Sequence, residues 1–390
     1  MSEIFDYWEL ILIPIFFALG WVAARVDMRQ VVRESRALPR SYFEGLNFLL
    51  NEQSDKAIDS FLEVTRLDSQ TIELHFALGN LFRRRGETDR AIRMHQNLID
   101  RDDLPQDLRL KALLELGQDF LNAGLLDRAQ AIFQKLEKTD LEEKARGHLL
   151  AIYQSGKEWE KAIDLAKNLP DVAKQTEIAQ YYCELAAQNL MRSQLDLARQ
   201  NLDSAIIHNR QCVRASILEG DLFLRLDKPD QAILAWQNVE LQNPDYLALL
   251  PARLSEAYRK IGQEKEGLAL LKGYLARYPS VDLLDAVSQG VLEEEGEEAT
   301  FRLVRGELQR NPSLLGLERL LSAAQSLVKP ESKPDVELAK SIVQGYTRRL
   351  SRYHCTNCGF KARQFYWRCP ACGTWESMPP QRSEELERGI

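Results

Sequence analysis

A repeat of about 34 residues constrains the fold of this chain more than any other feature. Small residues recur at regular intervals, at Ala57, Ala91, Ala129, Ala162, Ala198 and Ala232, and more weakly at Gly267 and Ala299. Successive members are 34, 38, 33, 36, 34, 35 and 32 residues apart. A second small residue often stands twelve positions earlier, as at Gly45, Gly79, Gly117, Ala186 and Gly220. Such self-similarity predicts a stack of similar units, each burying its apolar face against its neighbours.

One unit, residues 78–95, indicates what each repeat contains. We expect a helix, a turn at Gly86 in the left-handed conformation, and a second helix that begins near Asp89. Gly79 is placed where a bulky side chain would block the neighbouring helix, and Phe82 follows one turn later. Prolines close some units, as at Pro244 and Pro279. The small–aromatic–small–proline pattern is typical of tetratricopeptide repeats. We therefore predict an all-α superhelix over residues 41–350, with about eight to nine units.

Composition agrees with this helical body and excludes several classes. The chain has 390 residues, a formal net charge of −7 and six cysteines. The acidic balance gives no general argument for a nucleic-acid partner. Six cysteines are too few for a disulfide scaffold of this length. The sequence has no phosphate-binding loop, nucleophile elbow or His-Glu-x-x-His motif, and we predict that the protein is not an enzyme and has no catalytic residues.

The N-terminal segment is strongly apolar. Residues 10–24 carry no charge, and Arg25, Arg29 and Arg33 follow them. Trp8 and Trp21 suit the two interfaces of a membrane. A cleavable signal peptide would need a basic start, and a buried core helix would need neighbours that explain it. We favour a single-pass anchor over residues 1–25 that contacts the lipid bilayer, followed by a connector over 26–40. The positive-inside rule then places the large C-terminal body in the cytoplasm.

The sharpest chemical signal lies near the C-terminus, in two Cys-x-x-Cys pairs that are each followed by glycine and are separated by ten residues. The predicted metal ligands are Cys355, Cys358, Cys369 and Cys372. Four thiolates complete a tetrahedral shell suited to one zinc or iron ion, and both metals stay open. We expect a small rubredoxin-like or zinc-ribbon module over 351–378, with a hairpin between the knuckles whose core is Phe365, Tyr366 and Trp367, and a tail over 379–390. His354 is expected to lie outside the ligand set.

Other chemically suggestive residues have ordinary structural interpretations. Cys183 and Cys212 are interpreted as solitary core residues, and the run Glu293–Glu295 as a solvated face. The run Arg83–Arg85 is interpreted as positive charge near the end of a helix rather than a binding patch. Basic residues surround the module, namely Arg348, Arg349, Arg352, Lys361, Arg363 and Arg368. They allow either nucleic-acid contact or docking on protein.

The combination of anchor, repeat array and four-cysteine module resembles the lipopolysaccharide assembly protein B family (LapB, also called YciM) over nearly the whole chain. The stretches that carry the resemblance are 45–50, 78–82, 90–93, 182–186 and 366–370. It implies a bacterial inner-membrane adaptor that promotes degradation of the LpxC deacetylase by the FtsH membrane protease and scaffolds lipopolysaccharide assembly proteins. It also implies an inner-membrane partner that senses lipopolysaccharide, and assigns the four cysteines as metal ligands.

Two functions of other classes stay open. A single iron in a rubredoxin-like shell can transfer one electron. Alternatively, the basic ribbon binds nucleic acid, with an affinity that falls as salt rises.

Overall fold

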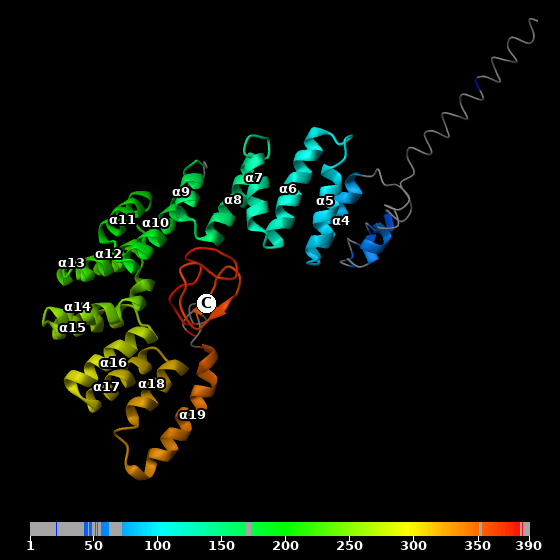
Figure 1. The fold of residues 1–390 in the computed structure, drawn as a ribbon. Helices are drawn as coiled ribbons and strands as arrows, with labels where there is room; N and C mark the ends of the chain where they lie inside the picture. The colour runs from blue at the N-terminus through cyan, green and yellow to red at the C-terminus, as the bar shows by residue number, and fades with distance from the viewer. Residues whose placement is uncertain are drawn as a thin grey trace, which may run out of the picture. The chain divides into compact units, whose positions relative to one another are not determined.

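The computed structural model describes residues 21, 43–45, 47–48, 51, 53, 56–61, 72–168, 173–350, 353–382 and 384. In these residues the chain is almost entirely α-helical, as predicted (Figure 1). Apart from Trp21, the predicted anchor and the whole connector lie outside the described residues. Among the described helices, none combines the length and the apolar character that a membrane span requires.

The chain divides into two compact units, Met1–Ser155 and Gly156–Ile390. The helices described in full that begin in the first unit are α4 (Ile72–Arg84), α5 (Thr88–Ile99), α6 (Gln106–Asn122), α7 (Leu126–Leu136) and α8 (Glu142–Gly156). From α4 to α7, each helix packs against the next one, and the helices joined by a short turn form the helix–turn–helix unit that the period predicts.

The second unit continues the helical pairs and ends in a small ribbon. Its first helices are α9 (Trp159–Lys167), α10 (Ala173–Met191), α11 (Leu195–His208), α12 (Val213–Arg225) and α13 (Pro229–Gln242). A 3₁₀ turn, η1 (Pro244–Leu249), precedes α14 (Pro251–Lys260), α15 (Glu264–Arg277), α16 (Val281–Glu295), α17 (Glu297–Arg310) and α18 (Leu314–Ala324). The chain then forms η2 (Pro330–Ser332), α19 (Lys333–Leu350), β1 (Tyr353–His354) and β2 (Lys361–Ala362).

The recurring glycines make room for a ring sixteen residues later. A Cβ atom at Gly117 would lie 2.6 Å from Cε1 of Phe133, and one at Gly220 would lie 2.1 Å from Nε1 of Trp236. The same relation joins Gly45 to Phe61 and Gly79 to His95. The small residues on the second helices, from Ala57 to Ala232, are fully buried. The prediction that small residues permit close helix packing is confirmed.

The turns between paired helices share one backbone conformation with different residues. Gly86, Gly124 and Gly262 have φ angles of 77°, 74° and 70°. The matching turns that lack glycine use Lys157, Ser193 and Asp227 at φ angles of 56°, 59° and 58°. Left-handed conformations are costly for residues with a Cβ atom. The packing of the paired helices therefore imposes the turn even where the sequence does not favour it.

A buried ionic network gives Arg83 a structural role that the sequence did not reveal. Its guanidinium contacts a Glu115 carboxylate oxygen at 2.5 Å and Asp119 Oδ1 at 2.9 Å. Asp119 Oδ2 lies 2.5 Å from Nδ1 of His95, and both of these side chains are fully buried. The interpretation of Arg83 as positive charge near the C-terminal end of its helix is therefore incomplete. This arginine also compensates the buried carboxylate of Asp119 on α6, the first helix of the next repeat.

Two other predictions have mixed outcomes. Residues Glu293–Glu295 are exposed, as expected for a solvated face. Cys183 and Cys212 are core residues, but they are not solitary, because their sulfurs lie 3.8 Å apart. Residue 183 lies on α10 and residue 212 directly precedes α12, and these helices pack together. Only this packing brings residues so distant in the sequence into contact.

Candidate metal centre

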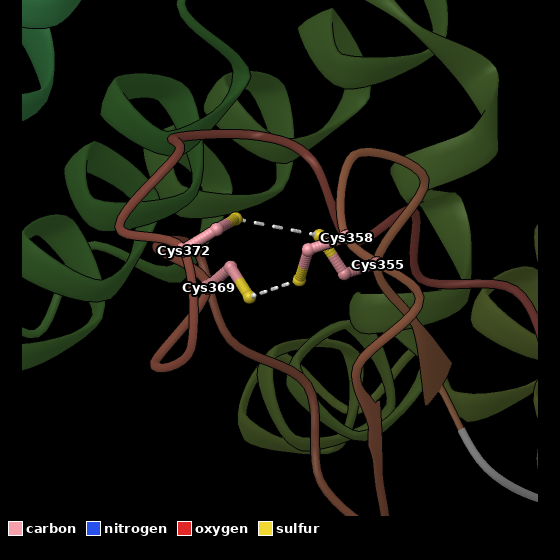
Figure 2. Close-up of side chains that lie close together, drawn as sticks. All are labelled: Cys355, Cys358, Cys369 and Cys372. Carbon is pink, nitrogen blue, oxygen red and sulfur yellow. Dashed lines mark hydrogen bonds between the residues drawn. The ribbon is translucent and has the colours of Figure 1, made fainter. Parts of the chain in front are cut away.

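The four predicted cysteines converge at one point of the ribbon (Figure 2). All four Sγ atoms lie within 4.8 Å of one another. The Cys355–Cys372 sulfur distance is 3.8 Å and the Cys358–Cys369 distance is 3.7 Å. The first cysteine of each knuckle is buried, and the second is exposed.

The two knuckles repeat the same backbone geometry. The N–H groups of Cys355 and Cys369 donate to the carbonyls of Phe360 and Thr374, five residues later, at 2.8 and 2.9 Å. The fifth residue of each motif is Gly359 or Gly373, with φ angles of 76° and 73°. The N–H group of each glycine donates a hydrogen bond to the carbonyl oxygen of the first cysteine in its knuckle, at 2.9 Å. This left-handed glycine lets both sulfurs of a knuckle point to one side.

The prediction of one hairpin between the two knuckles is wrong. The structure instead pairs the chain on either side of each knuckle, so that each knuckle lies at the turn of its own hairpin. β1 pairs antiparallel with β2 across the first knuckle, and Arg368 bridges Trp375 across the second. The ribbon core consists of Tyr353, Cys355, Cys369 and Met378, with Phe365 and Tyr366 packed beside it. Trp367 belongs instead to the core of the repeat helices. The sequence did not show this because the ring's partner lies far away in the chain.

The sulfur positions fit a tetrahedral metal ion. Ligands at about 2.3 Å from a central zinc lie roughly 3.8 Å from each other at tetrahedral corners. Two of the sulfur pairs, at 3.8 and 3.7 Å, match this spacing. The four cysteines therefore form a zinc-ribbon-like metal site, and four thiolates are equally compatible with a single iron. His354 lies on β1, outside this group, as expected.

Polar neighbours prepare the sulfurs for metal binding. The Thr374 hydroxyl, the Asn357 amide and the Thr374 N–H group together lower the pKa of the Cys372 thiol to about 5. At Cys355, burial opposes ionisation, but the Ser377 hydroxyl at 3.3 Å and backbone N–H groups lower the pKa overall. At Cys358, a backbone bond from Phe360 lowers the pKa, yet desolvation and the other sulfurs raise it to about 12. A bound cation would favour the thiolate at all four positions.

Three residues that contact the sulfurs, Asn357, Thr374 and Ser377, were not predicted from the sequence. Asn357 donates its amide to the Cys372 sulfur at 3.5 Å and to the Thr374 hydroxyl at 3.0 Å, which links the two knuckles. Polar residues inside or directly after a Cys-x-x-Cys-Gly turn are the signal that could have identified Asn357 and Thr374. Ser377 lies 22 positions after Cys355, and its place beside that residue follows only from the fold.

Aromatic contacts hold the ribbon against the repeat helices of the second unit, inside the curve of α10–α19 (Figure 1). Trp367 stacks on Tyr246 with a centroid distance of 5.2 Å and an interplanar angle of 3°. Trp375 meets the edges or faces of Trp159 and Tyr181 at 6.1 and 6.0 Å. The Arg214 guanidinium lies over both ribbon indoles, at 5.6 and 5.8 Å.

Polar contacts extend this docking along the unit. Gln180 donates to the Glu376 carboxylate at 2.8 Å, between residues 196 positions apart. Arg382 forms a two-pronged ion pair with Asp282, at 3.0 and 2.6 Å. Glu384 accepts the first two N–H groups of α18, those of Leu314 and Leu315, at 2.6 and 3.0 Å. The ribbon and the residues after it therefore contact the repeat helices from α9 to α18.

The basic residues around the ribbon are not all free for a ligand. Arg368 donates to the carbonyl of Gly373 at 3.0 Å, and its guanidinium lies 5.8 Å from the Trp375 ring. Lys361, Arg363 and Arg348 are exposed. The side chain of Arg349 and the whole of Arg352 lie outside the described residues.

Comparisons with known proteins agree with this architecture. A family profile described as "Rubredoxin metal binding domain" matches residues 353–380, and tetratricopeptide repeat profiles match residues 74–108 and 190–248. Lipopolysaccharide assembly protein B of Escherichia coli K12 is 34% identical over 378 residues, covering 95% of this chain and 97% of that protein. The protein of the same name from Haemophilus influenzae is 33% identical over 391 residues, covering 96% and 98%. The chain therefore belongs to the lipopolysaccharide assembly protein B family.

Proposed function

We propose that this protein is a non-enzymatic adaptor at the bacterial inner membrane that controls lipopolysaccharide synthesis. It holds the LpxC deacetylase for proteolysis by the FtsH membrane protease, and an inner-membrane regulator that senses lipopolysaccharide restrains it. Family membership supports the link to lipopolysaccharide assembly. The observation that supports the adaptor mechanism is the docked ribbon, which makes a metal site part of a helical-repeat array. Arrays of this kind offer extended surfaces for binding other proteins.

The metal has a bracing role in this proposal. Four thiolates fill a tetrahedral shell and leave no position for a substrate. A ribbon of this size has a small core of its own and depends on the metal to fold. When bound, zinc or iron supplies cross-links between the two knuckles. The folded ribbon then holds Trp367 and Trp375 in contact with the repeat helices.

The apolar segment 10–24 supports the membrane location. An anchor confines the array to the surface where a membrane protease works, which raises the effective concentration of a bound client. The arginines that follow the segment support a cytoplasmic body.

The test uses the intact protein from detergent-solubilised membranes. We expect FtsH to co-purify with it, and LpxC to accumulate when the protein is depleted. Cys355→Ser and Cys372→Ser should unfold the ribbon and raise LpxC levels, while far-ultraviolet circular dichroism shows that the repeats stay helical. Cys183→Ala is the matched control, because this cysteine is buried outside the metal site. Normal LpxC levels in both serine variants would contradict the proposal.

Exposure of two ligands favours electron transfer as a second candidate. Cys358 and Cys372 lie at the surface, so a bound iron would be close to solvent and to a redox partner. A reversible one-electron couple in protein purified with its native iron would support this function. Native zinc would exclude it.

A further inference from the structure

In the part of the chain that the structure describes, the ribbon contacts the repeat helices of the second unit near their N-terminal ends. Its contacts, and those of the residues after it, involve Arg214 near the start of α12, Asp245 before α14, Asp282 in the first turn of α16 and Leu314 at the start of α18. The C-terminal halves of α10, α12, α14 and α16 are not involved in these contacts. This region is where a further partner has access to the first helices of several successive repeats.

Two hollows occupy this region. One, of about 650 Å³, lies among α14, α15 and α16. The other, of about 580 Å³, is lined by the C-terminal ends of α10, α12 and α14. Glu256 lines both hollows, which are therefore direct neighbours. We call the two adjoining hollows the acidic groove.

Small residues create the space in the groove and apolar residues form its floor. Ala252 and Gly290 line the larger hollow and expose no bulky side chain there. Leu268 and Leu271 lie beneath and are buried. At the other end Met191 is 74% exposed, an unusual state for a long apolar side chain. An apolar side chain of a partner would find an exposed apolar contact at Met191.

The charge of the groove selects the partner. Six acidic residues line it against three basic ones, and they are Asp221, Asp227, Glu256, Glu264, Glu293 and Glu294 against Arg225, Arg259 and Lys260. One of the basic residues, Arg225, already donates to the carbonyl of Leu190. Arg253, beside the groove, neutralises only Asp221. The remaining negative charge is complementary to lysine and arginine side chains.

We infer that the acidic groove binds an extended basic peptide segment with apolar side chains between its charges. The groove crosses four first helices, α10 to α16. At roughly 8–10 Å between packed helices, the distance is about 24–30 Å. An extended chain covers this with about seven to nine residues at roughly 3.3 Å each. This inference rests on the proposed adaptor function, because it assigns a binding site for a client or regulator of that adaptor.

The test measures binding of a fluorescein-labelled nine-residue peptide with alternating lysine and leucine to the full-length protein in detergent. We expect saturable binding that weakens as salt rises. The double variant Glu256→Lys with Glu293→Lys should bind about tenfold more weakly, since two attractions become repulsions. Asp203→Lys is the matched control, because Asp203 is an exposed acidic residue of the same unit outside the groove. A peptide with glutamate in place of lysine should not bind.

Two results would overturn the inference: equal affinity of the double variant and the Asp203→Lys control, or equal binding of the glutamate peptide. The proposed function is judged separately, from FtsH co-purification and LpxC levels in cells. Peptide binding that depends on Glu256 and Glu293, with LpxC unchanged on depletion, keeps the groove and removes the adaptor function. The opposite pattern keeps the adaptor and removes the groove.

Discussion

Replacing Trp367 with alanine tests whether the array holds the ribbon in place. The indole stacks on Tyr246 at 5.2 Å and lies 5.6 Å from the Arg214 guanidinium carbon. The aromatic pair and the cation–π contact are each worth about 1 kcal/mol. Loss of roughly 50–100 Å² of buried apolar surface adds about 1–2 kcal/mol. Because these terms share one ring, we expect a loss of about 3 kcal/mol, or roughly 100-fold in the docking equilibrium.

Hydrogen–deuterium exchange followed by mass spectrometry measures this change in peptides that cover residues 367–378. Exchange should become faster there in Trp367→Ala, while the metal content stays the same, because Trp367 lies outside the cysteine cluster and the ribbon core. Trp367→Phe keeps an aromatic stack and should show an intermediate rate. Unchanged exchange in the alanine variant would refute the docking argument. Faster exchange accompanied by metal loss would show that Trp367 supports the ribbon itself.

Gly220→Ala should destabilise the protein by about 1–3 kcal/mol in chemical denaturation, because the new Cβ would lie 2.1 Å from Nε1 of the buried Trp236 ring. Gly147→Ala meets no atom within 4 Å and should stabilise α8 by up to about 1 kcal/mol; destabilisation in this control would contradict the packing argument. Arg83→Ala leaves the buried Asp119 carboxylate uncompensated and should cost about 3–5 kcal/mol, whereas the exposed Arg84→Ala should change stability by less than about 0.5 kcal/mol. Burial, with a smaller effect of Glu240, raises the pKa of Tyr274 to about 12. The protonated hydroxyl therefore stabilises the folded state below a pH of about 10, the usual tyrosine pKa. This contribution is lost as the pH rises from about 10 to 12. Tyr274→Phe should reduce that alkaline loss, and an identical pH dependence in the two proteins would show that another group causes it.

Local spacing determined much of this protein. The small residues, turn glycines and rings repeat within about one unit, and the contacts that they make are also short in sequence, as in the sixteen-residue step from Gly220 to Trp236. The two Cys-x-x-Cys-Gly turns likewise specify their own backbone geometry, because each closes through hydrogen bonds within six residues. The sequence alone therefore predicted the helical repeat and the four-sulfur cluster.

The tertiary structure decided the features that depend on distant residues. In the fold, Trp367 stacks on Tyr246 instead of packing in the ribbon core. Arg83 pairs with Asp119, a carboxylate on the first helix of the next repeat. The sulfurs of Cys183 and Cys212 lie side by side. The tertiary structure also formed the acidic groove from helices more than one repeat apart. A periodic pattern states which face of a helix is buried, and it does not state which distant surface covers that face. The curvature of the packed helices decides this, since it brings together residues such as Gln180 and Glu376, 196 positions apart.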